Sequence, residues 1–351
     1  MAAPKMSCVL VTGGTGFIGA HVVDNLLERG LKVRVAIRNL KKGELLRDAR
    51  LEHASKLDFV QVADFAKATS FHEAVRDVEG IIHVASPLNF GVQDNEKDFI
   101  LPAINGVKSI LEATAQAPQV RRVVITSSFG AVINADRKAP PRFTYTAADW
   151  NPLSYEEAAD NKSPQIVAYR GSKKFAELAA WEFVQREKVN FDMVTLCPPM
   201  VFGPIVHPVA RMDELNDSAA RLWEVASGSN PMPVARVPFW IDVRDLAQAH
   251  VEALLRPGIG NKRFTVASPE RFSYQKAAEI IMSEFDWGKS RVCQSGGKQE
   301  IDDSHDLDGE TAAKELGLTY RSFRESVVDF VTQATKLEEM QKSQAQEPAE
   351  A

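Results

Sequence analysis

The segment that decides the fold is Cys8-Val9-Leu10-Val11-Thr12-Gly13-Gly14-Thr15-Gly16-Phe17-Ile18-Gly19, an apolar run of strand length followed directly by a glycine-rich turn. A helical pattern begins at Phe17, so the glycines lie between a strand and a helix, as in sites that bind the pyrophosphate of a dinucleotide. There Gly13 takes a backbone angle that other residues avoid, Gly16 lets the backbone approach the phosphates, and Gly19 allows close helix packing. A glycine-rich turn without a ligand is the alternative, and the flanking strand and helix favour the dinucleotide site.

Apolar runs of strand length alternate with helical stretches through the first 200 residues. Most of the strands are nearly continuous in Val, Ile and Leu, as expected for strands that are covered on both faces. The alternation predicts an α/β fold, a Rossmann-type doubly wound parallel sheet with helices on both sides. The predicted strands are Cys8–Thr12, Lys32–Ile37, Leu57–Val62, Gly80–Ala85, Arg122–Thr126 and Phe191–Cys197, and the predicted helices are Phe17–Arg29, Phe99–Ala117 and Tyr169–Glu187.

The regular alternation stops after Gly203, where several prolines interrupt short segments. We therefore expect a nucleotide-binding domain over residues 1–200 and a smaller, irregular, mainly substrate-binding part over residues 201–335. Residues 239–256 return to a helical pattern, with Asp242 as the N-cap, and residues 239–267 are expected to pack back on the sheet. Residues 336–351 are rich in Glu, Gln, Lys and Ala, which predicts a frayed helix end and a disordered tail.

The composition is that of an ordinary globular chain, with 351 residues, 44% apolar residues, 25% charged residues and a net charge of −5. It lacks the basic excess typical of nucleic-acid binding, so we expect no nucleic-acid partner. The three cysteines are widely spaced and expected to be reduced, and no signal region or membrane-length segment is visible, so we expect a cytoplasmic protein that does not bind membranes. The histidines show no metal-ligand spacing and no Gly-x-Ser-x-Gly motif occurs, which disfavours metal chemistry and the commonest hydrolases.

The end of the second predicted strand carries Arg38. An acidic residue at this place holds the ribose 2′-hydroxyl of NAD, whereas a guanidinium suits the 2′-phosphate of NADP. Lys42 follows and adds a second cation, so NADP(H) is the expected cofactor. Asp64, which closes the third strand, is a candidate to bind the adenine amino group. The alternatives are that Arg38 is an ordinary surface cation and that Asp64 only caps a loop.

Tyr169 and Lys173 stand four residues apart on a predicted helix. This interval places the phenol and the ammonium on one helix face, where the cation is expected to lower the pKa of the phenol and prepare it to donate a proton to a carbonyl oxygen. A Tyr-x-x-x-Lys pair is common by chance, and here its weight comes from the glycine-rich turn upstream. Together the two motifs predict a nicotinamide-dependent carbonyl reductase.

Further segments make the chain resemble the extended short-chain dehydrogenase/reductases of the NAD-dependent epimerase/dehydratase family. Within them it looks like the dihydroflavonol-reductase branch, and most like the fungal NADPH-dependent aldehyde and ketone reductases. The resemblance covers roughly residues 7–335. It rests on Thr12–Gly19, Arg38, Asp64-Phe65, His83–Pro87, Thr126–Ser128, Tyr169–Lys173, Pro198–Pro204 and Asp242–Asp245, with Leu101–Gly106 and Asp149–Pro152 most similar to the fungal enzymes.

The resemblance implies a Ser-Tyr-Lys catalytic set. Ser128 would orient the substrate oxygen, Tyr169 would donate the proton, and Lys173 would bind the nicotinamide ribose and keep the pKa of the phenol low. The segment from Pro198 to Val201 would lie against the nicotinamide ring, which supplies the hydride. The expected cofactor contacts are Gly13, Thr15, Gly16, Phe17, Ile18, Gly19, Arg38, Lys42, Asp64, Phe65, Ala85, Tyr169, Lys173, Pro198 and Val201.

The predicted function is NADPH-dependent reduction of an aldehyde or ketone, in a fungal secondary-metabolite pathway or in aldehyde detoxification. Two alternatives stay open: a nucleotide-sugar epimerase or dehydratase, which can use the same Ser-Tyr-Lys set, and a non-catalytic NADP-sensing module. A basic cluster for a substrate diphosphate is hard to find, which disfavours the epimerase. Apolar side chains are expected at the substrate pocket, namely Phe90, Phe129, Phe202 and Trp223. The expected partner is a small-molecule carbonyl substrate, and the expected state is a monomer or a homodimer.

Overall fold

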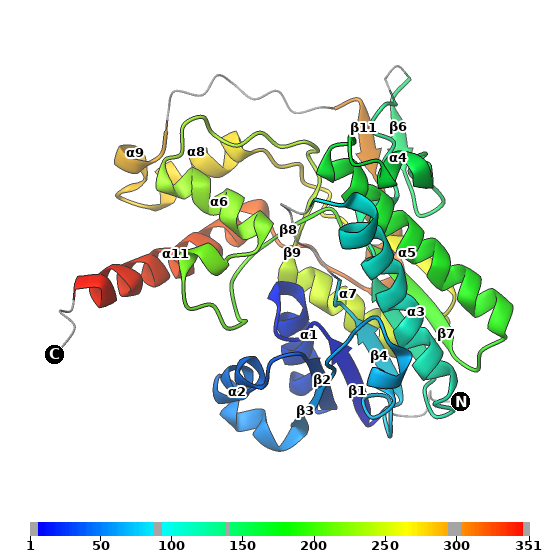
Figure 1. The fold of residues 1–351 in the computed structure, drawn as a ribbon. Helices are drawn as coiled ribbons and strands as arrows, with labels where there is room; N and C mark the ends of the chain where they lie inside the picture. The colour runs from blue at the N-terminus through cyan, green and yellow to red at the C-terminus, as the bar shows by residue number, and fades with distance from the viewer. Residues whose placement is uncertain (1–5, 87–92, 138–140, 294–302, 347–351) are drawn as a thin grey trace.

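A seven-stranded parallel sheet forms the centre of the molecule (Figure 1). The computed structural model describes residues 6–86, 93–137, 141–293 and 303–346. The strands of the sheet are β1 (Cys8–Thr12), β2 (Lys32–Ile37), β3 (Leu57–Gln61), β4 (Gly80–His83), β5 (Arg122–Thr126), β7 (Asp192–Cys197) and β10 (Lys262–Thr265). They lie in the order β10-β7-β5-β4-β1-β2-β3.

The order of the strands creates a crevice beside β1. From β1 the chain first extends the sheet to one side through β2 and β3, and then crosses to the other side through β4, β5, β7 and β10. The connections that follow β1 and β4 therefore run in opposite directions. Ligands of open α/β sheets bind at this point, outside the carboxyl ends of the strands.

Both faces of the sheet are apolar, because successive side chains of each strand point to opposite faces. In β1, Val9 and Val11 belong to one core cluster and Leu10 belongs to the other. The same alternation recurs in β4, where Ile82 joins the first cluster and Ile81 the second. The first face is covered by α1 (Phe17–Glu28) and α7 (Val243–Leu255), and the second by α3 (Leu101–Ala115) and α5 (Gln165–Glu187).

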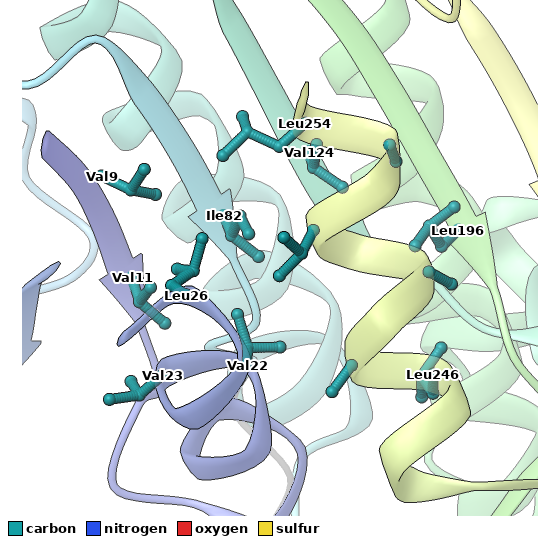
Figure 2. Close-up of a cluster of buried hydrophobic side chains, with 14 of the residues drawn as sticks. Val9, Val11, Val22, Val23, Leu26, Ile82, Val124, Leu196, Leu246 and Leu254 are labelled. Atoms are coloured by element: carbon teal, nitrogen blue, oxygen red, sulfur yellow. The ribbon is translucent and has the colours of Figure 1, made fainter. Parts of the chain in front are cut away.

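Figure 2 shows the first of these clusters, where α1 and α7 meet the sheet. Leu26 of α1 and Leu246 and Leu254 of α7 are completely or almost completely buried, as are Val124 and Leu196 of the strands below. Each buried side chain of this size stabilises the fold by about 1.5–3 kcal/mol. The strands that are continuously apolar in the sequence are thus buried under helices on both faces of the sheet.

The parallel sheet with helices on both faces confirms the predicted fold class. All six predicted strands are present, with ends that differ by at most two residues from the prediction. The predicted N-cap of α7 is also correct, since the Asp242 carboxylate accepts a hydrogen bond from the Arg244 N–H at 2.8 Å. The seventh strand, β10, was missed because it is only four residues long and lacks a continuous apolar run.

The buried Arg122 side chain at the start of β5 connects β5 to β7 and to the end of α7. Its Nη1 donates to the carbonyl oxygens of Ala253 at 2.9 Å and Arg256 at 2.7 Å, at the end of α7. Its Nη2 donates to the Asp192 carboxylate at the start of β7 at 2.9 Å. A cation at the carboxyl end of a helix is favourable for the helix dipole. One guanidinium therefore joins two strands and the helix that covers them.

The remaining elements form a smaller part with a core of its own. Phe202, Trp240, Phe272, Phe323 and Phe330 are at most 1% exposed and belong to this separate cluster. The helices around it are α6 (Asp217–Ser227), α8 (Tyr274–Glu284) and α11 (Phe323–Gln346), and the parallel pair β8 (Met200–Phe202) and β9 (Trp240–Asp242) joins it to the sheet. The other elements are α2 (Leu40–Asp48), β6 (Phe143–Tyr145), α4 (Tyr155–Ala159), α9 (Gly288–Arg291), β11 (His305–Leu307) and α10 (Glu310–Leu316).

The prediction of a disordered tail from residue 336 is wrong as far as residue 346. Helix α11 continues to Gln346, and Figure 1 shows it extending past α6 and α9. Glu338 pairs with Arg291 at 2.7 Å, and the side chain of Gln341 accepts from the Met212 N–H at 3.1 Å. The composition that suggested disorder consists of strong helix formers, and the helix is already anchored by its apolar first half. Residues 347–351 lie outside the described residues.

No helix in the described ranges is long and apolar enough to cross a membrane. The same residues contain no group of three or more His, Cys, Asp or Glu side chains arranged to hold a metal ion.

Candidate active site

A cleft of about 750 Å³ opens where the strand order reverses, at the carboxyl ends of β1 and β4. Its walls come from the glycine turn after β1, the ends of β2 to β5, the first half of α3, the part of α5 from Tyr169 to Glu177, and the short segments Pro199–Val201 and Asn216–Ser218. All but one of the residues expected to contact a cofactor line this cleft. The exception is Pro198, which does not line the cleft, whereas its neighbour Pro199 does. The lining includes Gly13, Thr15, Gly16, Phe17, Ile18, Gly19, Arg38, Lys42, Asp64, Phe65, Ala85, Tyr169, Lys173 and Val201.

The glycine turn has the geometry that its sequence requires. Gly13 has φ +72°, and a Cβ there would lie 2.8 Å from the Ala85 nitrogen at the end of β4. A Cβ at Gly19 would lie 2.1 Å from the Gly13 carbonyl oxygen. Only glycine fits at both places. Helix α1 begins at Phe17, directly after the turn, so its first amide groups are available to an anion in the cleft.

The far end of the cleft is formed by the ends of β2 and β3. Arg38 and Lys42, which follow β2, and Asp64 and Phe65, which follow β3, are among its lining residues. The Asp64 carboxylate accepts a hydrogen bond from the Ala66 N–H at 2.9 Å, which lowers the pKa of Asp64 below its usual value. Two cations and a fixed carboxylate thus lie in the places that the sequence assigned to the adenosine end of NADP.

Tyr169 lines the cleft and contacts Ser128, which is itself not among the lining residues. The Tyr169 hydroxyl donates to Ser128 Oγ at 3.2 Å. Ser128 is the N-cap of the short helical turn Phe129–Ala131, and its Oγ accepts from the Gly130 N–H at 3.0 Å, which fixes the rotamer of the serine. The structure therefore brings together the serine from the end of β5 and the tyrosine from α5.

Lys173 lies one helical turn beyond Tyr169 and faces the same cleft. Its Nζ donates to Ser86 Oγ at 2.7 Å and lies 5.9 Å from the centre of the Tyr169 ring. Burial lowers the pKa of Lys173 to about 8. His83, at the end of β4, has a pKa lowered to about 4 by burial and by the nearby Lys173 charge. The cleft is therefore a place where positive charge is costly.

The net pKa of Tyr169 is raised in the structure, whereas the sequence led us to expect that Lys173 keeps it low. Burial raises the pKa of the phenol, and the hydrogen bond with Ser128 offsets part of this effect. The Lys173 ammonium is bonded to Ser86 instead of to the phenol oxygen. Tyr169 is therefore fully protonated at neutral pH, the state in which it is able to donate a proton.

Two residues that the sequence analysis missed, Asn216 and Ser218, also line the cleft at the start of α6. Ser218 Oγ donates to the Val201 carbonyl oxygen at 2.6 Å, and Asn216 Nδ2 donates to Ser218 Oγ at 2.8 Å. Because the serine proton is used on Val201, the serine only accepts from Asn216, and this fixes the orientation of the amide. Asn216 Oδ1 is then a buried acceptor without a hydrogen-bond partner in the part of the chain that the structure describes.

Three of the predicted apolar pocket residues, Phe129, Phe202 and Trp223, do not line the cleft. Phe129 is 3% exposed and packs against Tyr145 and Phe239, and Phe202 is 1% exposed and lies within the core of the smaller part. Trp223 packs at the edge of that core with the Arg291 guanidinium over its ring. These aromatic side chains bury more apolar surface in the core than at a cleft rim, and that burial decides their position. Phe90 lies outside the described residues.

Comparison with known proteins agrees with this geometry. Residues 9–267 match the model of the family described as "NAD dependent epimerase/dehydratase family". The chain is 37% identical over 337 residues to "Ketoreductase azaE" of Aspergillus niger, covering 92% of this chain and 96% of that protein. It is 34% identical over 348 residues to "NADPH-dependent methylglyoxal reductase GRE2" of Saccharomyces cerevisiae, covering 94% and 98%.

A solved structure of yeast methylglyoxal/isovaleraldehyde reductase Gre2 complexed with NADPH has a similar fold. It superposes with a TM-score of 0.86 at 32% sequence identity, and the match covers 95% of this chain and 99% of the yeast protein. The family match spans most of the chain and the two relatives are well above 30% identical over almost their whole lengths. The protein therefore belongs to the NAD-dependent epimerase/dehydratase family, among its fungal reductase-like members.

Proposed function

We propose that this protein is an NADPH-dependent carbonyl reductase that acts on an aldehyde or a ketone. The observation that carries the proposal is the contact between Tyr169 and Ser128, 3.2 Å apart, with Lys173 one helical turn away in the same cleft. A buried phenol with a raised pKa and a serine hydroxyl are the two donors that a carbonyl oxygen needs when it becomes an alkoxide. Relatives named as NADPH-dependent methylglyoxal reductase and ketoreductase support the proposal.

The residues of the cleft fit a nicotinamide dinucleotide phosphate. A Cβ at Gly16 would meet only the Gly13 carbonyl oxygen, at 3.4 Å, so glycine leaves room for a group to approach the start of α1. Arg38 and Lys42 would hold the 2′-phosphate, and Asp64 would hold the adenine. The buried Oδ1 of Asn216 is an acceptor in need of a donor, such as the N–H of a carboxamide.

The chain's own residues would position and protonate the substrate. When bound, the nicotinamide supplies the hydride to the carbonyl carbon. Ser128 and Tyr169 hold the carbonyl oxygen between their hydroxyl groups, and Tyr169 gives its proton to that oxygen as negative charge develops. Lys173 lies close enough to the phenol to stabilise the phenolate that remains.

The division of labour between the two parts of the chain follows the lining of the cleft. We assign cofactor binding mainly to residues 1–200, which supply the glycine turn, Arg38 and Asp64 of the cleft, and substrate binding mainly to residues 201–335. We further expect a cytoplasmic monomer or homodimer with a small-molecule carbonyl substrate, in aldehyde detoxification or in a secondary-metabolite pathway. No nucleic-acid partner is expected at a net charge of −5.

The test of the proposed function is oxidation of NADPH, followed by its absorbance, with a panel of aldehydes, diketones, aromatic ketones and nucleotide sugars. Net oxidation of NADPH with at least one carbonyl compound is expected. Turnover of a nucleotide sugar without net change of the cofactor would establish the epimerase alternative instead. Tight NADPH binding without turnover of any compound would favour the sensing module.

The choice of cofactor provides a separate prediction. The unmodified protein should bind NADPH at least about tenfold more tightly than NADH, or about 1.4 kcal/mol, because the ion pair of Arg38 with the 2′-phosphate is lost with NADH. Arg38→Asp should reverse this order, since a carboxylate repels the phosphate and accepts from a ribose hydroxyl. Dissociation constants from quenching of protein fluorescence measure both effects, and equal affinities in the unmodified protein would contradict the assignment of Arg38.

A further inference from the structure

The carboxylate of Glu177 is the most deeply buried acidic group near the candidate catalytic residues. Glu177 lies on α5, four residues after Lys173 and eight after Tyr169, so the three side chains share one face of the helix. Its side chain is only 1% exposed, yet it forms part of the floor of the cleft. A charged group in such a place is costly unless it is paired and fully hydrogen-bonded.

Both oxygens of Glu177 are occupied by donors from three neighbouring strands. Ser127 Oγ, at the end of β5, donates to Oε2 at 2.6 Å, and Thr195 Oγ1 of β7 donates to Oε1 at 2.6 Å. The Arg263 guanidinium of β10 donates from Nε to Oε1 at 2.8 Å and from Nη2 to Oε2 at 3.2 Å. One carboxylate therefore joins α5 to β5, β7 and β10 at the carboxyl-terminal side of the sheet.

Arg263 extends this network to the chain that passes behind the catalytic serine. Its Nη1 donates to the carbonyl oxygens of Ala147 at 2.8 Å and Asp149 at 2.5 Å, and its guanidinium stacks over the Trp150 ring at 3.7 Å. The next residue, Asn151, donates from its side chain to the carbonyl oxygens of Gly130 and Arg170. Gly130 and Arg170 adjoin the catalytic pair, since the Gly130 N–H donates to Ser128 Oγ and Arg170 follows Tyr169.

We propose that Glu177, neutralised by Arg263, is a positioning residue that sets the distance between Ser128 and Tyr169 through Ser127. The proposal rests on the carbonyl reductase function, because it concerns how the two hydroxyl groups are held for one carbonyl oxygen. Ser127 is the only residue between the end of β5 and Ser128, so the hydrogen bond from Ser127 to Glu177 fixes the backbone that carries Ser128 relative to α5. Neither Glu177 nor Ser127 contacts the reacting atoms in this assignment.

The chain offers a matched pair of substitutions to test this role. Ser127→Ala and Thr195→Val each remove one hydroxyl that donates to the Glu177 carboxylate at 2.6 Å. The Ser127 hydroxyl donates to Oε2 and the Thr195 hydroxyl to Oε1. Only Ser127 adjoins the catalytic serine. Ser127→Ala should lower kcat about tenfold and increase the deuterium isotope effect on kcat with deuterated NADPH, because the hydride step becomes slower. Thr195→Val should change kcat less than about twofold.

Asp192→Asn is a control for stability alone. It weakens the ion pair between Asp192 and Arg122, which lie at the amino-terminal ends of β7 and β5, away from the cleft. This variant should lower the melting temperature without changing kcat or the isotope effect. Glu177→Gln should lower both the melting temperature and kcat, because it leaves the Arg263 charge buried without its partner. The dissociation constant of NADPH should stay within about twofold in all four variants, since none of these residues is assigned to the cofactor.

The proposal would be overturned if Ser127→Ala and Thr195→Val had the same kcat, or if Ser127→Ala acted only through weaker NADPH binding. Failure of the underlying function is distinguishable, because the unmodified protein would then oxidise no NADPH with any carbonyl compound, which would overturn both proposals. A lower melting temperature in Ser127→Ala with an unchanged kcat would show a merely structural role and would also refute the positioning role.

Discussion

Tyr169→Phe should reduce the rate of carbonyl reduction by a factor on the order of 100 or more, while NADPH still binds. The phenylalanine ring keeps the packing of the tyrosine and removes only the hydroxyl that meets Ser128 Oγ. No other group that holds a proton at neutral pH is assigned to the carbonyl oxygen, apart from the Ser128 hydroxyl, which is a much weaker acid. The measurement is kcat with the best substrate of the panel, together with the dissociation constant of NADPH.

Ser128→Ala is the companion of this variant. It should slow reduction by about ten- to a hundredfold without changing NADPH affinity, because it removes one of two hydrogen bonds to the developing alkoxide. A Tyr169→Phe protein that kept near-normal turnover of a good substrate would refute the Ser-Tyr-Lys assignment. The proton donor would then have to be sought among the other residues of the cleft.

Lys173→Met should abolish most of the activity and yet make the protein more stable. Carbonyl reduction should fall on the order of a hundredfold and NADPH should bind more weakly, because the ammonium is assigned both to the cofactor ribose and to the phenolate. Stability should rise by about 1 kcal/mol at pH 7, or about 1–2 °C in melting temperature, because burial of the charged amine opposes folding. A residue kept at a cost in stability is typical of an active site.

The pH dependence of this gain in stability has a definite sign. The pKa of Lys173 is about 8 in the folded protein and 10.5 in its ordinary state. Between these values the folded protein has lost the proton while the unfolded chain still binds it, so raising the pH stabilises the unmodified protein. The advantage of Lys173→Met should therefore be fully present at pH 7 and shrink above pH 8. A gain that grew with pH would contradict the burial of the charged amine.

The strands and the catalytic set were predictable because they depend on short, local patterns. An apolar run such as Val9 to Val11 is buried on both faces whatever surrounds it, and the glycines after it are required by backbone geometry within seven residues. The interval between Tyr169 and Lys173 is likewise a property of one helix. The structure adds the contact of Tyr169 with Ser128, which follows β5, and of Lys173 with Ser86, which follows β4.

The parts that escaped prediction depend on contacts between distant residues. Nothing near Glu177 or Arg263 in the sequence indicates that they meet, because 86 residues separate them. The same is true of Asn216, whose orientation is set by the Val201 carbonyl oxygen through Ser218. Phe129 and Phe202 are apolar, but each is buried in a core cluster of its own, and the partners in those clusters come from distant parts of the chain.

The attachment of α7 and β10 to the sheet has a consequence for how the protein is made. Val124 and Leu196 belong to strands that end by residue 197, yet the helix that covers them is complete only at Leu255 and the neighbouring edge strand only at Thr265. A ribosome that adds about 5–20 residues per second leaves this apolar face uncovered for several seconds while the intervening segment emerges. During this time the nascent chain exposes the apolar sheet face that α7 later covers, while its first strands are already able to pair. The sequence of the whole sheet is complete at Thr265, before α11 is synthesised.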